Sequence, residues 1–407
     1  MNYRTNSTFL LEFFLWLRAL LTFVPATAEY SPMVINVGTV FMVYVLLIAN
    51  VEGRLIEKTF LRFLPLYLIA IVNVMWGYKS GTLFTFIYGI MQWMIWPIAV
   101  SYLIKEKKYK VANRLYILSS LLILYTAVTT YYGNETIPGA SRALAAIWSK
   151  DTETAHVYRQ LNIGGFEFVY LLTLMVSLWI YVIRAKAEKW LFLLSAISIV
   201  VSFATIIKTE YTTALLFSLA GIALLVLPRN LTTKHLIFYI AVFAAFVIIG
   251  GSFVSTLFIR VAHTTESAVF AERFSGLSDY IMGSSLEGDA GTRQEVMVQS
   301  WNAFIQNPLT GSPKVGGHSL ILDTMGRFGI WGIMLLCIVF GRLYKICVRP
   351  QKGTLYYGYL LFIYICQIGL ALLNTTIIFD FFLIIAPLIG LITREQKKQI
   401  IKSYSPQ

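Results

Sequence analysis

Charged side chains are scarce in this sequence. They make up only 13% of its 407 residues, whereas hydrophobic side chains make up 57%. A soluble chain of this length needs about a quarter of its residues charged to cover its surface, so the composition excludes an ordinary soluble domain. Apolar runs of about 20 residues, long enough to cross a bilayer, recur from end to end. The composition therefore predicts an all-α polytopic membrane protein, with residues 1–407 forming a single integral membrane domain.

Cysteine and histidine are also rare, and neither forms a ligand pattern. The three cysteines lie in predicted helices or in a loop predicted to be inside, so they imply no disulfide framework. The four histidines are scattered without metal-ligand spacing. No Walker A lysine pattern occurs. The sequence therefore predicts no metal, no cofactor and no use of ATP.

About twelve transmembrane helices account for the apolar runs. They are predicted over residues 9–26, 33–50, 60–76, 82–104, 112–132, 163–183, 190–207, 212–228, 236–258, 319–340, 354–373 and 376–393. The first is interpreted as a retained helix, because Glu12 and Arg18 interrupt what would be the core of a signal peptide. The last two are separated by little more than Asn374 and Thr375, which predicts a tight helical hairpin.

The distribution of Lys and Arg predicts the orientation. Most of the 33 lie in alternate short loops and near the two ends of the sequence, and such an excess marks the cytoplasmic side. Both termini are therefore predicted to be cytoplasmic. The net charge of +13 then reflects membrane topology and not a nucleic-acid partner. Two long segments, 133–162 and 259–318, are predicted to lie outside.

Six charged residues are predicted near the outer ends of their spans. They are Glu167, Lys208, Glu210, Asp323, Arg327 and Asp380. Charged groups at this depth are costly unless they face water or a partner. Any one of them can simply cap a helix end, but six at one level predict a polar cavity that opens to the outside.

The longest polar interruption runs from Gly291 to Gly332. Thr292 to Glu295 has the form of a capping box and predicts a helix that begins there, with Arg293 in its first turn. Exposed N–H groups and the helix dipole favour an anion at such a position, and a guanidinium adds bidentate phosphate recognition. An apolar stripe at helical spacing follows and can lie on the membrane or on the bundle: Met297, Trp301, Phe304 and Ile305.

His318 lies where this segment returns to the membrane, directly after Gly316 and Gly317. Its ordinary pKa of ~6.5 suits it to take a proton from a hydroxyl group near neutral pH. A simpler reading is also open for both candidates. In that reading His318 is an interfacial histidine and Arg293 contacts only lipid headgroups.

The order of residues in this segment resembles the signature region of the O-antigen ligase and polymerase family. The matching residues are Arg293, Trp301-Asn302-Ala303-Phe304, Asn307-Pro308-Leu309-Thr310-Gly311, Gly317-His318-Ser319 and Gly329-Ile330-Trp331-Gly332. The patch Asn162-Ile163-Gly164-Gly165-Phe166-Glu167 resembles the polymerase branch. The number of spans and the long late outer loop are similar over most of the chain.

The resemblance implies a metal-independent membrane glycosyltransferase with a GT-C-like architecture in the bacterial plasma membrane. Its donor and acceptor would be undecaprenyl-diphosphate-linked oligosaccharides at the outer face. Arg293 would bind the diphosphate and act in catalysis with His318, which would activate the acceptor hydroxyl. Lys208 stands where the family usually has a second arginine, although lysine lacks the fork geometry of a guanidinium.

The resemblance also implies the remaining site residues and the partners. Arg273 is a further candidate for binding the diphosphate, and Arg260 is another basic residue on the same loop. Glu167, Glu210, Asp323 and Asp380 would support the site. The partners would be the lipid bilayer and the lipid-linked glycans, with a chain-length regulator as a further partner to consider.

Two other functions remain open at this point. A ligase would pass a finished glycan to a lipid A core, but the patch ending in Glu167 and the moderate loop length favour a polymerase. A transporter or flippase would carry polar groups near the midplane and broken helices in symmetric halves. This sequence shows no repeat and gathers its polar groups at one face.

Overall fold

The protein is helical throughout the part that the computed structural model describes, and that part contains no β-strand. The described residues are 3–51, 53–75, 83–147, 152–185, 189–225, 234–235, 237–239, 241, 251–265, 267–281 and 288–393. A helix satisfies its own backbone N–H and C=O groups, which a lipid environment cannot do. The predicted all-α class is therefore confirmed.

The first predicted spans correspond to helices of similar length. These are α1 (Tyr3–Phe23), α3 (Met33–Asn50), α4 (Gly53–Met75), α5 (Leu83–Lys105) and α6 (Tyr109–Thr136). The predicted span 9–26 differs at both ends, because α1 begins earlier and stops at Phe23. Val24 is extended, and Pro25, which has no N–H to donate, begins the short helix α2 (Pro25–Tyr30).

The segment 133–162, predicted to lie outside, is largely helical. After the end of α6 it contains α7 (Ala140–Ile147) and α8 (Thr152–Gln160). The next spans then follow as predicted, as α9 (Phe166–Arg184), α10 (Lys189–Lys208) and α11 (Thr212–Ala223). Residues 226–228 of the predicted span 212–228 lie outside the described residues.

The segment 259–318 is also built mainly of helices. It contains the end of α13 (Gly251–Thr264), α14 (Ala268–Ile281) and α15 (Gly288–Gln306). Residues 242–250 of the predicted span 236–258 lie outside the described residues, and α13 continues past the predicted end of that span.

The predicted span 319–340 is wrong, because the structure divides it into two helices. α16 (Leu320–Phe328) and α17 (Ile330–Leu343) meet at Gly329, whose φ of 59° is open mainly to glycine. The chain continues from α17 through η1 (Tyr344–Val348), η2 (Arg349–Gln351) and α18 (Tyr356–Leu373).

The final connection is longer than the predicted hairpin. α18 ends at Leu373 and the next helical residue is Phe379, followed by the π-helical turn η3 (Phe381–Ile385). Gln367, which is 0% exposed, holds the intervening segment. Its Nε2 donates to Thr376 O at 3.3 Å, and its Oε1 accepts from Ile378 N at 3.0 Å. The connection can be longer than a two-residue turn because the Gln367 side chain bonds to backbone groups that have no helical partner.

Six of the described helices are long and apolar enough to cross a membrane. They are Met33–Asn50, Tyr109–Thr136, Phe166–Arg184, Lys189–Lys208, Ile330–Gln351 and Tyr356–Leu373, with Thr212–Ala223 and Phe381–Thr393 as shorter apolar helices. These helices make the protein membrane-embedded. The count of twelve spans stays a prediction.

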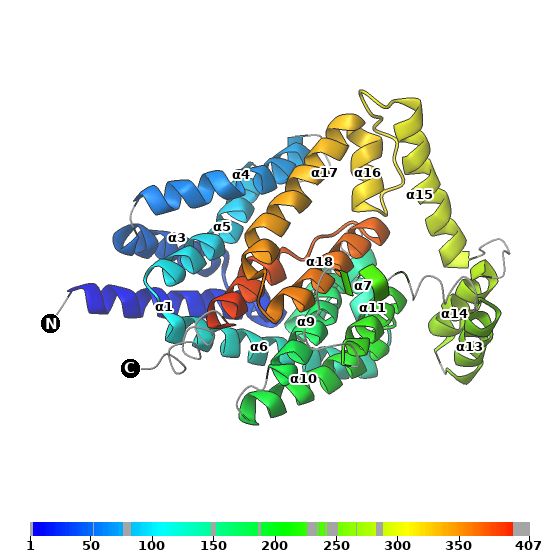
Figure 1. The fold of residues 1–407 in the computed structure, drawn as a ribbon, viewed down its shortest axis with the longest axis horizontal. Helices are drawn as coiled ribbons and strands as arrows, with labels where there is room; N and C mark the ends of the chain where they lie inside the picture. Colours follow the sequence, from blue (N-terminus) through cyan, green and yellow to red (C-terminus); the bar gives the residue numbers. More distant parts are fainter. Residues whose placement is uncertain are drawn as a thin grey trace.

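The helix α9 lies at the centre of the core. It is buried from Val169 to Val182 and contacts α10, α11 and α18 (Figure 1). Near its end, the ring of Tyr181 packs against those of Tyr356 and Tyr359, with centroids 4.8 and 5.5 Å apart. A helix that is apolar on all sides lies inside a protein or in lipid, and α9 is enclosed by the bundle. α9 therefore fixes the position of Glu167, which lies in its first turn.

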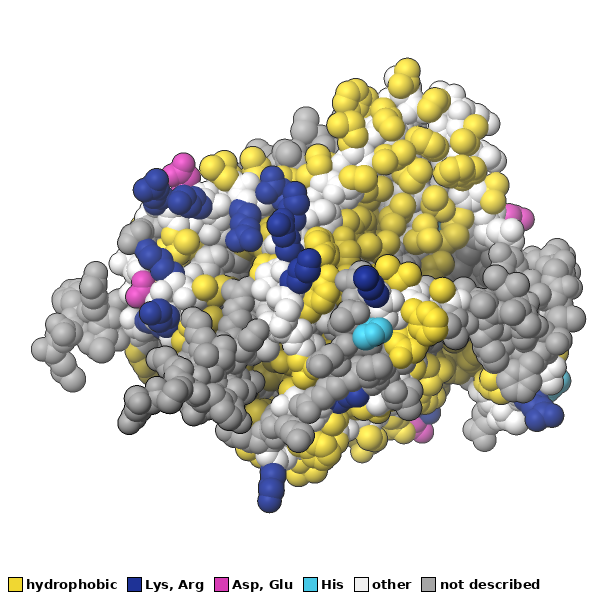
Figure 2. Space-filling model, viewed as in Figure 1, with side chains coloured by type: hydrophobic (Ala, Val, Ile, Leu, Met, Phe, Trp, Pro, Cys, Tyr) yellow, Lys and Arg dark blue, Asp and Glu magenta, His cyan; other side chains and the backbone are white. Residues whose placement is uncertain are grey.

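The start of α1 and the end of the last described helix lie toward the same end of the bundle (Figure 1). At this end Arg114 pairs with Glu12 at 3.1 Å, and the Tyr181 hydroxyl lies 3.0 Å from that of Thr393. Most of the Lys and Arg side chains on the face in Figure 2 gather toward this end. The predicted orientation places this end in the cytoplasm.

Fusions to alkaline phosphatase test that orientation. We expect a fusion after Thr264, at the end of α13, to be active, and a fusion after Lys352 to be inactive, because the enzyme folds only outside the cytoplasm. Phosphatase activity of whole cells, normalised to the amount of fusion protein, is the measurement. The reverse pattern would overturn the orientation.

Candidate functional site

α15 carries Arg293, but the helix does not begin where the capping box predicts. It is already helical at Gly288, so Thr292 lies within it and Arg293 lies in its second turn. The expected capping box is therefore wrong, and the N–H groups of a helix start are not next to Arg293. The preceding residues extend the helix, so Thr292 has no helix start to cap. The structure describes the backbone position of Arg293 on this helix.

The glycines of the signature segment allow close backbone contacts between α15, the following loop, α16 and α17. The N–H of Gly311, at φ 72°, donates to Asn307 O at 2.8 Å, and a Cβ there would overlap the carbonyl of Arg327. A Cβ on Gly329 would overlap the carbonyl of Pro308, which accepts from Ile330 N at 2.7 Å. These glycines have a structural role that explains their spacing.

Asp323 is the centre of the loop that carries His318. Its Oδ1 accepts from Ser300 Oγ at 2.6 Å and from Gly317 N at 3.1 Å, and its Oδ2 accepts from Ser319 N at 3.1 Å. Ser300 Oγ in turn accepts from Gly316 N at 2.9 Å. Both Asp323 and Ser300 are buried. Asp323, which was predicted to support the site, therefore fixes the backbone on both sides of His318.

His318 is exposed, directly before the buried helix cap Ser319. Ser319 Oγ accepts from Leu322 N at 3.1 Å and so begins α16. His318 thus lies on a fixed backbone with an accessible imidazole.

The loop also brings His318 close to the helix turn that carries Arg293. Gly316 lies so close to the carbonyl of Val296 that a Cβ would overlap it. Val296 is three residues after Arg293 on α15, a rise of about 4.5 Å. The structure therefore brings the two predicted catalytic residues onto adjacent backbone segments.

A second connection joins the start of α16 to Glu167. Leu320 N donates to Asn374 O at 2.9 Å, and Thr376 Oγ1, two residues on, donates to Glu167 Oε1 at 3.5 Å. Asp380, on the same connection after α18, interacts electrostatically with Glu167 and with Arg18 of α1. Glu167 and Asp380 therefore lie close to one another.

The patch that begins at Asn162 joins three helices. Asn162 has φ 57°, and its Oδ1 accepts from Ala26 N at 3.2 Å while its Nδ2 donates to Thr129 Oγ1 at 2.8 Å. Gly164 N donates to Thr130 Oγ1 at 2.8 Å. The patch thus has a structural role before α9, and only Glu167 at its end is exposed.

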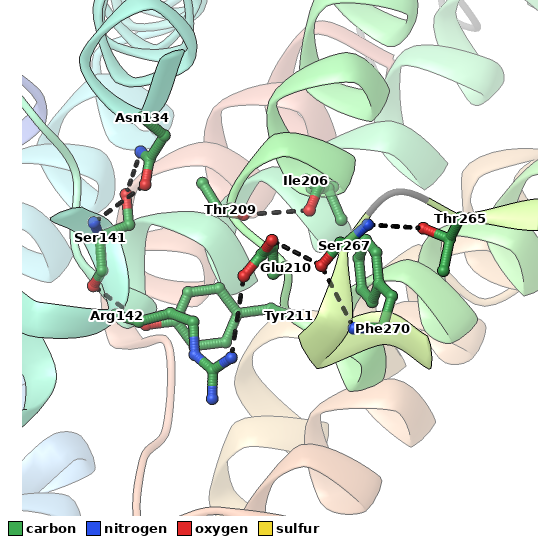
Figure 3. A network of polar contacts seen from close by, with 10 residues as sticks. All are labelled: Asn134, Ser141, Arg142, Ile206, Thr209, Glu210, Tyr211, Thr265, Ser267 and Phe270. Carbon is green, nitrogen blue, oxygen red and sulfur yellow. Dashed lines mark hydrogen bonds and ion pairs between the residues drawn. The ribbon is translucent and has the colours of Figure 1, made fainter. Parts of the chain in front are cut away.

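Glu210 lies in a separate polar network, shown in Figure 3, and Lys208 lies two residues before it. Lys208 pairs with Glu135. Glu210, at φ 59° in the turn between α10 and α11, accepts from Ser267 Oγ at 2.6 Å and lies 4.0 Å from Arg142 Nη1. Ser267 Oγ also accepts from Phe270 N at 3.2 Å, which caps α14. This network ties α14 to α7 and to the turn after α10.

The other predicted cations lie on the helices of the long outer segment. Arg273 is half-buried on α14 and engaged with its surroundings, and Arg260 is exposed on α13. Within the described part of the chain, no group of His, Cys, Asp and Glu has the arrangement of a metal site. The three cysteines are free, as predicted: Cys337, Cys347 and Cys366.

Five of the six charges predicted at one level form separate local groups and not one shared set. Glu167 lies near Asp380, Lys208 pairs with Glu135, Glu210 belongs to the α14 network, and Asp323 holds the His318 loop. Sequence reasoning missed the importance of Arg18 and Ser300. A charge inside an apolar span could have indicated Arg18, whereas nothing in the sequence distinguishes Ser300 from other helical serines.

Comparison with known protein families finds no family model that matches this chain, and comparison with curated proteins finds no match either.

Replacing Gly329 tests the backbone contacts of the signature. We expect Gly329→Ala to lower the free energy of unfolding by about 1–3 kcal/mol more than Gly317→Ala, because only Gly329 faces a carbonyl. Gly317 is a matched control, since it also has a positive φ and nothing lies near its missing Cβ. Thermal unfolding in detergent is the measurement, and equal midpoints for the two variants would contradict the model of close packing.

Asp323→Asn tests the clamp on the His318 loop. The amide keeps the size of the side chain but has one acceptor oxygen, so a buried N–H loses its partner at a cost of about 1–3 kcal/mol. We expect trypsin to cleave after the exposed Lys314 roughly tenfold faster, because local opening becomes more populated. Asp279→Asn, on the exposed side of α14, is the control and should leave the cleavage rate unchanged.

Proposed function

We propose that the protein is a membrane glycosyltransferase that polymerises undecaprenyl-diphosphate-linked oligosaccharide repeats into O-antigen, capsular polysaccharide or exopolysaccharide. The contact between α15 and the His318 loop is the observation that carries this proposal. Gly316 lies against Val296, one helical turn from Arg293, while Asp323 holds the residues on either side of His318. A cation suited to a diphosphate and a base suited to a hydroxyl thus share one region.

In the proposed reaction, a hydroxyl of one lipid-linked repeat attacks the anomeric carbon of the growing chain. His318 accepts the hydroxyl proton as the new C–O bond forms. The C–O bond to the diphosphate breaks, and its electron pair leaves with undecaprenyl diphosphate. Arg293 stabilises the charge that develops on this leaving group.

The apolar surface around the site suits a donor that arrives from the bilayer. Hydrophobic side chains cover much of the face over α15, α16 and α17 in Figure 2. Trp331 is 64% exposed and Leu309 70% exposed, while Trp301 and Ile305 continue the surface along α15. Exposed apolar side chains of this size are stable against lipid, which suits a donor with a lipid tail.

The other proposed phosphate ligands have defined roles in this scheme. Lys208 already pairs with Glu135, which offsets the charge that it could offer to a diphosphate. Arg273 lies on α14, which contacts α15. Arg293 is therefore the principal phosphate ligand in the proposal, and the other two are secondary.

Substitution of Arg293 and His318 tests the proposed function. We expect Arg293→Ala and His318→Ala each to reduce long polymer by about 100-fold or more, because one stabilises the leaving group and the other takes the proton. Lys314→Ala is the matched control, since Lys314 is a basic, exposed residue of the same loop. The measurement is polymer length and amount on gels, at equal amounts of membrane-inserted protein. Normal polymer in both variants would refute the assignment.

A ligase is the second candidate, because the same two residues would serve transfer to a lipid A core. The glycan that accumulates in a deletion strain separates the two functions. Single repeats on the lipid carrier indicate a polymerase, whereas full-length glycan on that carrier indicates a ligase. Transport of lipid-linked oligosaccharide by the purified protein in vesicles would instead support a flippase.

A further inference from the structure

Arg18 is a buried charge with incomplete hydrogen bonding. It lies on α1 and is 4% exposed, and its Nε and Nη1 atoms are buried without a hydrogen-bond partner among the described residues. A guanidinium that has left water without replacing its hydrogen bonds destabilises a fold by several kcal/mol. Charged residues at such positions in membrane proteins mark functional sites by default.

Residues of three other elements are linked to this guanidinium, directly or through Asp380. Arg18 of α1 lies beside the hydroxyl of Tyr88 on α5 and is attracted to Asp380. Asp380 in turn interacts with Glu167 at the start of α9, to which Thr376 donates a hydrogen bond. Arg18 is buried, Asp380 is partly exposed and Glu167 is exposed. The group therefore extends from the surface toward the interior of the bundle.

The charges of this group disfavour an anionic ligand. Arg18 supplies one positive charge, whereas Glu167 and Asp380 supply two carboxylates. Arg159 also interacts with Glu167, but it already lies 3.8 Å from Glu29, a carboxylate that His156 pairs with as well. Burial lowers the pKa of Arg159 while Glu29 and Glu167 raise it, and an arginine remains charged near neutral pH. A diphosphate would therefore meet more repulsion than attraction here.

A polyhydroxylated ligand matches the same groups. Hydroxyl groups can donate to the carboxylate oxygens of Glu167 and Asp380 and accept from the unpaired N–H groups of Arg18. The rings of Trp93 and Phe379, next to Asp380 in the chain, pack with centroids 4.9 Å apart and are only partly buried. Aromatic rings of this kind offer an apolar surface to the C–H face of a sugar.

We propose that Arg18, Glu167 and Asp380 form a subsite that binds the hydroxyl groups of the glycan and not its diphosphate. The choice of a glycan among polyols rests on the proposed function, whereas the preference for a polyol over an anion rests on the charges alone. The connection through Thr376 and Asn374 to Leu320 joins this subsite to the His318 loop. Sugar recognition and phosphate recognition are then carried out by separate parts of one chain.

Binding of two probes to the purified full-length protein in detergent tests the inference. One probe is the phosphate-free oligosaccharide released from the host's lipid-linked glycan, and the other is undecaprenyl diphosphate without sugar. We expect Arg18→Gln, Glu167→Gln and Asp380→Asn each to weaken oligosaccharide binding at least about tenfold, the equivalent of one charge-assisted hydrogen bond. Binding of undecaprenyl diphosphate should stay unchanged. Glu12→Gln, earlier on α1 and paired with Arg114, is the matched control.

The alternative outcomes are distinct. Weaker binding of undecaprenyl diphosphate in these variants, with oligosaccharide binding intact, would identify a phosphate site and overturn the inference. No change with either probe would show that the group is only structural. If the wild-type protein binds undecaprenyl diphosphate but not the oligosaccharide, the subsite alone is refuted; if it binds neither, the proposed function fails too. Should Arg18→Gln not fold, Glu167→Gln decides, because that side chain is exposed.

Discussion

A backbone N–H that lies outside a helix in the interior of this protein needs an acceptor from elsewhere in the chain, because lipid offers none. Three buried side chains supply such acceptors at joints between helices. Asn162 serves the joint before α9, Asp323 the joint between α15 and α16, and Gln367 the connection after α18. Each is buried, and each holds an irregular segment in one conformation. The arrangement of the candidate site depends on these three residues.

The same requirement shapes the chemistry of the His318 loop. Its N–H groups at Gly316, Gly317 and Ser319 are already bonded to Ser300 and Asp323. The loop therefore has few N–H groups left to bind a phosphate, unlike the glycine-rich loops that cradle nucleotides. Any diphosphate at this site must be held by cationic side chains, which makes Arg293 central to the proposed mechanism.

The pairing of charges separates three regions of the outer half of the predicted membrane domain. Lys208 pairs with Glu135, and Arg142 faces Glu210, whose network joins α14 to the bundle. Arg293 lies on α15, near the His318 loop. Arg18 lies among carboxylates with part of its hydrogen-bonding capacity unused. In this scheme the first region is structural, the second handles phosphate and the third handles sugar.

Composition and periodicity alone determined the all-α membrane class and most of the helix positions, because long apolar runs leave the backbone no alternative to helices. They could not locate the breaks. Span 319–340 is apolar enough to be predicted as one helix, yet it is interrupted at Gly329, which contacts Pro308. Pro308 lies too far from Gly329 along the chain for a local sequence pattern to reveal this contact. The capping box at Thr292 failed because the preceding residues extend the helix.

Which charges meet was decided only by the tertiary structure. Arg18 and Asp380 are separated by almost the whole chain, and only the packing of α1 against the last connection brings their charges together. Lys208 looked like a phosphate ligand in the sequence, but folding places Glu135 beside it. A sequence specifies which residues can be charged. The interaction energy of two charges depends on the distance between them in space, and the order of residues along the chain does not give that distance.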